Sequence, residues 1–290
     1  MLVEVDELQK SFGGRTVLES VAFEVPAGSV FALLGPNGAG KTTVVNILST
    51  LLRPDGGRAL VAGHDVVTAP HAVRAAISVT GQFAAGDELL TGRENLVLMA
   101  RLNRVPGGVI PAVVDELLGR FDLEGAASRR VSTYSGGMRR RLDIAAGLVA
   151  RPQVLFLDEP TTGLDPRSRQ EMWRTVAELA ADGTTVLLTT QYLEEADQLA
   201  DRIAVLDAGR IVADGTAAQL KSRVGAELVE IEFADGSVEQ LPTDGSVERM
   251  RAVLDDVDTR PVPARRVDVR TPTLDDVFLA LTDTKAGARR

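Results

Sequence analysis

Residues 35–42 read Gly-Pro-Asn-Gly-Ala-Gly-Lys-Thr, which is the pattern of a phosphate-binding loop. Such a loop needs a buried strand before it and a helix after it, so this segment restricts the fold more than any other. The apolar run at 30–34 predicts the strand, and apolar residues at helical spacing over 44–52 predict the helix. The segment therefore predicts an α/β fold with a nucleotide site where strand meets helix.

The residues of the loop meet separate requirements of triphosphate binding. Its glycines allow successive backbone N–H groups to face phosphate oxygens, and the helix that follows adds the positive end of its dipole. Lys41 would reach the β- and γ-phosphates, and the Thr42 hydroxyl would ligate Mg²⁺. The predicted nucleotide-binding residues are Gly35, Pro36, Asn37, Gly38, Ala39, Gly40, Lys41, Thr42 and Thr43.

A second segment whose residues can take part in catalysis is the apolar run 154–157, which is followed directly by Asp158 and Glu159. This pattern puts both carboxylates at the carboxyl end of a buried strand, where α/β sheets bind ligands. Buried carboxylates without a partner are costly, so a purely structural role is disfavoured. We predict that Asp158 belongs to the Mg²⁺ shell and that Glu159 is the catalytic residue that polarises the attacking water.

A third segment is Tyr-Ser-Gly-Gly-Met at 134–138, at the start of an expected helix. Ser135, Gly136 and Gly137 offer a hydroxyl and open N–H groups, which together make an anion-binding turn. Ser-Gly-Gly is also ordinary loop chemistry, and only its place before the acidic strand makes it specific. The arginines at 139–141 fit a phosphate-binding patch or a solvated helix face equally well.

Composition sets outer limits on these interpretations. A chain of 290 residues with 44% hydrophobic residues can form one large or two modest domains. The net charge of −9 argues against nucleic acid as the main partner, and zero cysteines exclude disulfides and thiolate metal sites. A chain with two histidines offers too few for a histidine-rich metal centre. We find neither a membrane-spanning run nor a signal peptide, so we expect a soluble chain.

The order of expected elements predicts a largely parallel sheet with additions at each end. Residues 1–30 alternate as an antiparallel β layer. Short apolar runs at 154–157, 185–189 and 203–206 then alternate with a helix at 167–181. Further helices are expected at 93–102, 110–121 and 136–150.

The pattern of expected elements changes near residue 216, where a capping box predicts the start of a short helix. After it we expect a strand at 228–233, a helix at 248–257, a strand at 266–270 and a last helix at 273–282. This small α+β appendage contains no catalytic constellation. We interpret it as a docking or dimer-supporting module.

The three segments, in this order, resemble the ATP-binding cassette family of ABC transporters. The resemblance covers residues 1–222 and implies an α/β, P-loop NTPase cassette with a mixed sheet core, an antiparallel β layer and a helical insert at about 83–150. Residues 223–290 would form a C-terminal accessory domain and tail. At matching positions, Phe12 would stack on adenine, Gln82 would contact Mg²⁺ and water, and Asp165 would lie in the segment that crosses the dimer interface.

The resemblance also implies that one chain cannot complete the site. Two cassettes pair head to tail, so ATP and Mg²⁺ lie between the phosphate loop of one and the signature segment of the other. The partner would be a second ATP-binding subunit, expected to be a copy of this chain. The signature residues that would bind its nucleotide are Tyr134, Ser135, Gly136, Gly137 and Met138.

Two positions depart from the family pattern. Met138 stands where the signature usually has glutamine, and little loss is expected because the preceding three residues make the main contacts. Gln191 stands where the family normally has histidine. A glutamine amide can donate a hydrogen bond to the γ-phosphate but cannot become cationic. We expect Gln191 to keep a catalytic positioning role with weaker charge stabilisation.

Within the family the chain is similar to the daunorubicin/doxorubicin-resistance type of bacterial drug exporter. The segments that carry this likeness lie at 90–96, 134–143, 189–197 and 272–282. The resemblance implies an ATPase, peripheral to the cytoplasmic face of the cell membrane, that energises drug export through a separate transmembrane permease subunit. Residues 83–104 would face that subunit. Candidates for contact, or alternatively for the core of the insert, are Leu89, Leu96, Leu98 and Met99.

One alternative function stays open. ABC-type ATPases also act on ribosomes or DNA without any transport. Such proteins usually carry long coiled coils or two cassettes in one chain, and this sequence has neither heptads nor a second phosphate loop.

Overall fold

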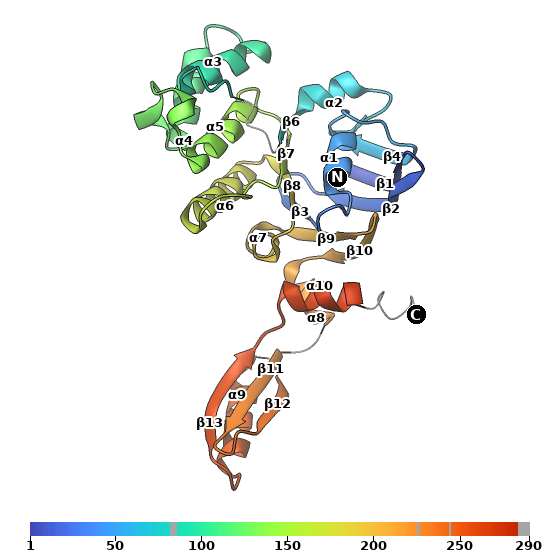
Figure 1. Cartoon of the computed structure of the whole chain (residues 1–290), viewed down its shortest axis with the longest axis vertical. Helices are drawn as coiled ribbons and strands as arrows, with labels where there is room; N and C mark the ends of the chain where they lie inside the picture. Colours follow the sequence, from blue (N-terminus) through green and yellow to red (C-terminus); the bar gives the residue numbers. More distant parts are fainter. Residues whose placement is uncertain (82–85, 225–226, 244, 284–290) are drawn as a thin grey trace. The chain divides into compact units, whose positions relative to one another are not determined.

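The computed structural model describes residues 1–81, 86–224, 227–243 and 245–283. The chain divides into two compact units, Met1–Asp214 and Gly215–Arg290 (Figure 1). The sequence predicts a domain boundary after residue 222. The compact units divide after Asp214, and the short helix after Thr216 therefore belongs to the second unit. The functional division between the cassette and its appendage stays a prediction.

The first unit is built on one ten-stranded sheet in the order β5-β4-β1-β2-β10-β9-β3-β8-β7-β6. The four strands at the β5 end pair antiparallel, whereas β9, β3, β8, β7 and β6 run parallel to one another. Its strands are β1 (Val3–Phe12), β2 (Arg15–Val25), β3 (Val30–Leu34), β4 (Gly56–Val61), β5 (His64–Asp65), β6 (Ile77–Thr80), β7 (Val154–Asp158), β8 (Thr185–Thr190), β9 (Arg202–Asp207) and β10 (Arg210–Gly215).

The helices of this unit pack on the sheet or gather in an insert between β6 and β7. They are α1 (Lys41–Leu48), α2 (Pro70–Ala76), α3 (Gly92–Leu102), α4 (Ile110–Arg120), α5 (Gly136–Leu148), α6 (Pro166–Ala181) and α7 (Leu193–Leu199), with short 3₁₀ turns at Glu124–Ala126 and Val131–Thr133. The predicted mixed α/β fold is confirmed. The helix after the phosphate loop is shorter than predicted, because Thr50 takes a left-handed backbone with φ 64° just after the last turn.

A hydrophobic core joins the antiparallel layer, helix α1 and the parallel strands. Phe23 of β2 stacks on Phe31 of β3 with ring centroids 4.9 Å apart. Val44, Ile47 and other apolar residues of α1 are buried in the same cluster. The residues between β3 and α1 are therefore fixed from both ends, and these residues form the phosphate loop.

The helical insert consists of α3, α4 and α5, which gather away from α1 in Figure 1. A capping box between Thr91 and Glu94 starts α3. Leu96 is fully buried in the insert, so of the two alternatives the structure favours a core role for this residue over contact with a partner. Leu89 and Leu98 are 74% and 40% exposed, and they remain candidates for contact.

The second unit holds a three-stranded antiparallel sheet in the order β12-β11-β13. Its elements are α8 (Ala217–Ser222), β11 (Glu227–Phe233), β12 (Val238–Thr243), α9 (Val247–Asp258), β13 (Ala264–Arg270) and α10 (Leu274–Asp283). Val229, Ile231 and Phe233 of β11 bury one face of the sheet against Val253 and Val257 of α9. The predicted α+β class of this unit is confirmed. Strand β12 was not indicated by the sequence pattern.

Candidate nucleotide-binding site

Four parallel strands end at one edge of the first sheet, in the order β3-β8-β7-β6. In the ladder Leu34 pairs with Thr190, and Asp158 pairs with Thr189. Three of these strands lead directly into functional segments that the sequence predicts: β3 into the phosphate loop, β8 into Gln191 and β7 into Glu159. The fourth strand leads through Gly81 to Gln82, which lies outside the described residues, so its role stays a prediction.

The phosphate loop depends on glycine at three positions for two different reasons. Gly38 and Gly40 have φ of 81° and 111°, a left-handed backbone that side chains disfavour. Gly35 has no positive φ, but a Cβ there would lie 2.2 Å from the carbonyl oxygen of Leu206. Gly40 is the N-cap residue of α1, and no side chain accepts a capping hydrogen bond from the first amides of the helix. These amides are therefore available to bind an anion.

Lys41 begins α1 with its ammonium almost buried. Its Nζ donates to the carbonyl of Gly35 at 2.7 Å and to that of Pro36 at 3.2 Å, and lies 3.5 Å from Oε1 of Glu159. Burial lowers the pKa of Lys41, although the neighbouring carboxylates of Glu159 and Asp158 oppose that change. The ammonium is therefore held at the place where the loop, the first helix and the acidic strand meet.

Asp158 and Thr42 bring hard oxygen atoms together. The Thr42 hydroxyl donates to Oδ2 of Asp158 at 3.1 Å, and the Thr189 hydroxyl donates to Oδ1. A hydroxyl and a carboxylate of this kind fit Mg²⁺, which takes few protein ligands and keeps several waters. Within the described residues no group of three or more His, Cys, Asp or Glu forms a closed metal cage. A hydroxyl and one carboxylate leave most positions around such a cation to water and phosphate.

Glu159 follows Asp158 in a left-handed backbone with φ 49°. Its N–H donates to the carbonyl of Thr189 at 3.1 Å, and the Thr162 hydroxyl donates to its Oε2 at 3.3 Å. The side chain is 12% exposed. A carboxylate that borders solvent beside a lysine can hold and polarise a water molecule.

A hollow of about 550 Å³ opens over the phosphate loop. Its lining residues are Phe12, Arg15, Val17, Asn37, Gly38, Gly40, Lys41, Thr42, Thr43 and Glu159. Phe12 ends β1, is 48% exposed and has the ammonium of Lys10 5.5 Å from its ring centre. An exposed ring at this rim offers a stacking platform for a base. Arg15 and Val17 also line the hollow, and no sequence motif marked them.

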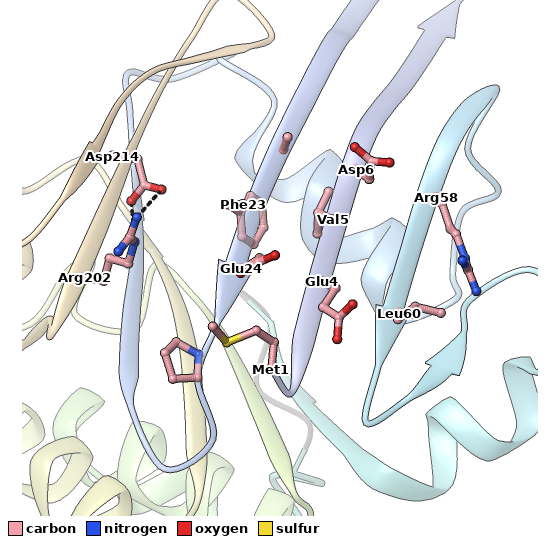
Figure 2. A pocket seen from close by; sticks show the side chains of 12 residues that line it. Met1, Glu4, Val5, Asp6, Phe23, Glu24, Arg58, Leu60, Arg202 and Asp214 are labelled. Carbon is pink, nitrogen blue, oxygen red and sulfur yellow. Dashed lines mark hydrogen bonds and ion pairs between the residues drawn. The ribbon is translucent and has the colours of Figure 1, made fainter.

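A second hollow, of about 560 Å³, lies on the antiparallel layer and is drawn in Figure 2. Four carboxylates line it against two guanidinium groups, and Arg202 is paired with Asp214 at 2.7 Å. The excess of negative charge makes this hollow unsuitable for a triphosphate. The carboxylates are Glu4, Asp6, Glu24 and Asp214.

The signature segment starts α5, and none of its residues line the hollow over the phosphate loop. Ser135 and Gly136 are exposed, and the Ser135 hydroxyl accepts from the N–H of half-buried Met138 at 3.2 Å. A Cβ on Gly137 would lie 2.8 Å from the hydroxyl of Ser168, so a side chain there would require Ser168 to shift. Within one chain, the turn and the phosphate loop remain separate sites.

The side chains of Tyr134 and Asp165 have structural partners. Tyr134 is buried, its hydroxyl donates to the carbonyl of Ala126 at 2.7 Å, and burial raises its pKa. Asp165 caps α6 by accepting from the hydroxyl and the N–H of Ser168, and these bonds hold the pKa of Asp165 below its usual range. Contact of either residue with nucleotide stays a prediction.

The arginine run after the signature fits neither sequence interpretation. Arg139 bonds Glu88 and the carbonyl of Ser132, and Arg141 bonds Asp122 and the carbonyl of Phe121. Arg140 donates to three backbone carbonyls around the acidic strand. All three are half-buried, so the run holds the fold together rather than forming a free basic patch or a solvated face.

The parallel sheet, the phosphate loop at its carboxyl edge and the acidic strand end beside it define a nucleoside triphosphatase of the phosphate-loop class. The model of the ABC transporter family matches residues 18–162. The chain belongs to the ABC transporter family and is an ATP-hydrolysing subunit of it. Members of this kind dimerise and work with a membrane permease.

The relatives extend beyond the matched region. The daunorubicin resistance ATP-binding protein DrrA3 of Streptomyces coeruleorubidus is 49% identical, over 97% of this chain and 95% of its own length. The doxorubicin resistance ATP-binding protein DrrA of Mycobacterium tuberculosis is 50% identical, over 97% of this chain and 94% of its own length. A solved ATP-binding subunit of an ABC transporter aligns with a TM-score of 0.69 at 30% identity, covering 77% of this chain and 93% of that one.

Proposed function

We propose that this chain hydrolyses ATP at the carboxyl edge of its first sheet, and that the hydrolysis energises export of a drug or another hydrophobic compound through a separate permease. The observation that carries the proposal is the likeness, of about half of all residues, to drug-resistance subunits over nearly the whole chain. That likeness includes the second unit, whereas the described residues that line the nucleotide hollow all belong to the first unit. It therefore favours this type of exporter over cassettes in general.

The residues divide the work of binding. The loop amides and Lys41 take the phosphates, and Phe12 takes the base by stacking. Thr42 and Asp158, whose oxygens lie 3.1 Å apart, would hold Mg²⁺, and Gln82 would join them. When bound, the cation neutralises phosphate charge and fixes the γ-phosphate.

The residues that act on the attacking water are Glu159 and Gln191. Glu159 lines the hollow, borders solvent and is the general base. Gln191 follows β8 directly beside the loop strand and donates its amide hydrogen to the γ-phosphate. Because this amide stays neutral, it positions the phosphate without adding positive charge.

The site is completed by a second copy of this chain. Ser135, Gly136 and Gly137 stand at the start of a 13-residue helix, where open amides and the helix dipole favour an anion. They do not border the nucleotide hollow of their own chain. Their ligand is thus the γ-phosphate of a nucleotide held by the partner. Asp165, bonded to the Ser168 that abuts Gly137, lies at the same interface.

Drug transport into inverted membrane vesicles tests this function. Vesicles that hold this chain and its separately encoded permease subunit should accumulate doxorubicin when ATP and Mg²⁺ are added. Glu159→Gln should abolish accumulation and hydrolysis while ATP still binds. The matched control is Glu178→Gln, because Glu178 is an exposed glutamate on α6 and outside the site.

Hydrolysis without drug movement would contradict export. The alternative function, a soluble ATPase that acts on ribosomes or DNA, would then be examined by purifying the chain under mild conditions. Ribosomes or DNA that copurify with it would support that alternative. The net charge of −9 gives such a partner little electrostatic attraction.

A further inference from the structure

Arg140 bonds the backbone at the catalytic edge of the sheet and does not line the nucleotide hollow. It lies in the second turn of α5, and its three guanidinium nitrogens donate to three different backbone carbonyls. Nε reaches Pro160 at 2.9 Å, Nη1 reaches Gly81 at 2.7 Å and Nη2 reaches Asp158 at 3.2 Å. No carboxylate of the site is among these partners, so the side chain acts on the backbone.

Two of these carbonyls stand on either side of Glu159. The backbone of Glu159 itself is left-handed, which costs free energy for a residue with a Cβ and requires restraint from neighbours. Its N–H is held from β8 by the carbonyl of Thr189. Arg140 holds the carbonyls before and after it. The peptide groups around the general base are thus fixed from two directions.

The surroundings of Arg140 make this contact strong. Burial lowers the pKa of Arg140, while the carboxylates of Asp143, Asp158 and Glu195 oppose that change and favour the charged form. A charged donor in a partly desolvated place makes stronger hydrogen bonds than a neutral one. The planar guanidinium can serve three acceptors in one plane, which an ammonium cannot reproduce.

We propose that Arg140 is a positioning residue for ATP hydrolysis: it fixes the strained backbone at Glu159 and ties it to the helix that begins with the Ser135–Gly137 turn. The inference rests on the proposed role of Glu159 as general base. The guanidinium of Arg140 also donates to the carbonyl of Gly81, the residue before Gln82. A nucleotide that docks on the turn of one subunit is therefore connected, through α5, to the general base of that same subunit.

The test measures kcat and KM for ATP with the full chain and its permease. Arg140→Gln should lower kcat by about 10- to 100-fold, because a small displacement of a catalytic group costs that much. KM for ATP should stay within about twofold, since the phosphate loop does not touch Arg140. Arg140→Lys should lie between the wild type and Arg140→Gln.

Arg141→Gln is the matched control. It makes the same change at the next position of α5, but the bonds of Arg141 among the described residues go to Phe121 and Asp122 of the insert. We expect its kcat to stay within about twofold of the wild type. Equal loss of kcat in both variants, or a rise in KM together with lower thermal stability, would show a general structural role and overturn the inference.

A double variant separates this inference from the proposed function. If Arg140 acts through Glu159, then adding Arg140→Gln to Glu159→Gln should change the residual rate by less than about twofold. A full additional loss would overturn the inference, as would an unchanged kcat in Arg140→Gln alone. Full hydrolysis in Glu159→Gln would instead refute the role of the general base. Should Arg140→Gln fail to fold, Arg140→Lys is judged by the same kcat and KM criteria.

Discussion

Glu195 is a fully buried carboxylate that the proposed mechanism does not use. Trp173 donates to its Oε1 at 3.3 Å, and its Oε2 has no hydrogen-bond partner among the described residues. Burial raises the pKa of Glu195, although the hydroxyls of Thr190 and Thr161, the bond from Trp173 and the charge of Arg169 oppose this. The folded chain therefore keeps this proton at a pH where the unfolded chain has lost it.

Stability should respond to pH through this residue. From the unfolded pKa of 4.5 upward to the raised folded value, the folded state binds more protons, so the free energy of unfolding falls as pH rises. Glu195→Gln removes that dependence, so the variant should gain stability relative to the wild type as pH rises from 4.5. Urea unfolding at a series of pH values measures this. Its neighbour Glu194, which is exposed, provides the control as Glu194→Gln; an identical trend in both variants would contradict the prediction.

Gln191 allows a prediction about charge. Gln191→Ala should lower kcat about tenfold, which corresponds to the loss of one hydrogen bond to a charged group. Gln191→His should retain or raise kcat, and most at a pH where the imidazole is protonated. Initial rates at saturating ATP between pH 6 and 8 measure both. Unchanged turnover in Gln191→Ala would remove this residue from the mechanism.

At the scale of elements, the strand, loop and helix at residues 30–48 form the phosphate site. Glycine is required there for two reasons, close packing at one position and a left-handed backbone at another. Gly35→Ala places a Cβ against the backbone of Leu206 and should cost about 3 kcal/mol of stability. Gly38→Ala meets no atom within 4 Å and costs only its left-handed backbone, about 1 kcal/mol. Thermal unfolding of the two variants compares them directly. A larger loss in Gly38→Ala would show that loop strain, not close packing, governs this segment.

The elements show what a sequence can and cannot predict. The β3, phosphate loop and α1 unit was predictable because strand, glycine turn and helix each carry a local pattern. The left-handed Thr50 that ends α1 early has no such pattern, and neither does the weakly alternating β12. The arginine run could not be interpreted because its acceptors, such as Gly81 and Pro160, are distant in the sequence. Roles that depend on tertiary contacts need the fold.

At the scale of the whole molecule, each chain offers one phosphate loop and one signature turn, and these lie on different parts of the first unit. Two variants should therefore complement each other. Lys41→Ala and Ser135→Arg should each be inactive alone, because every dimer then lacks a complete site. A mixture should regain hydrolysis, since a mixed dimer joins an intact loop to an intact turn.

The regained rate of the mixture, measured against equal amounts of each variant alone, decides between two arrangements. If the mixture stays inactive while both variants still form dimers, the site would be completed within one chain. Chromatography with light scattering establishes dimerisation in each sample. Lys221→Ala, a change in the second unit, serves as the control that keeps its activity.

The exposed ring of Phe12 has a consequence for energy supply. A stacking platform accepts the flat face of any base, and the polar side chains around the described hollow serve mainly the phosphates. We expect GTP to be hydrolysed with a KM within about tenfold of that for ATP, and Phe12→Ala to weaken both alike. A strong preference for ATP would contradict this. A pump that recognises phosphates and a flat ring, rather than the edge of adenine, draws on the whole purine nucleotide pool and keeps working when adenylates alone run low.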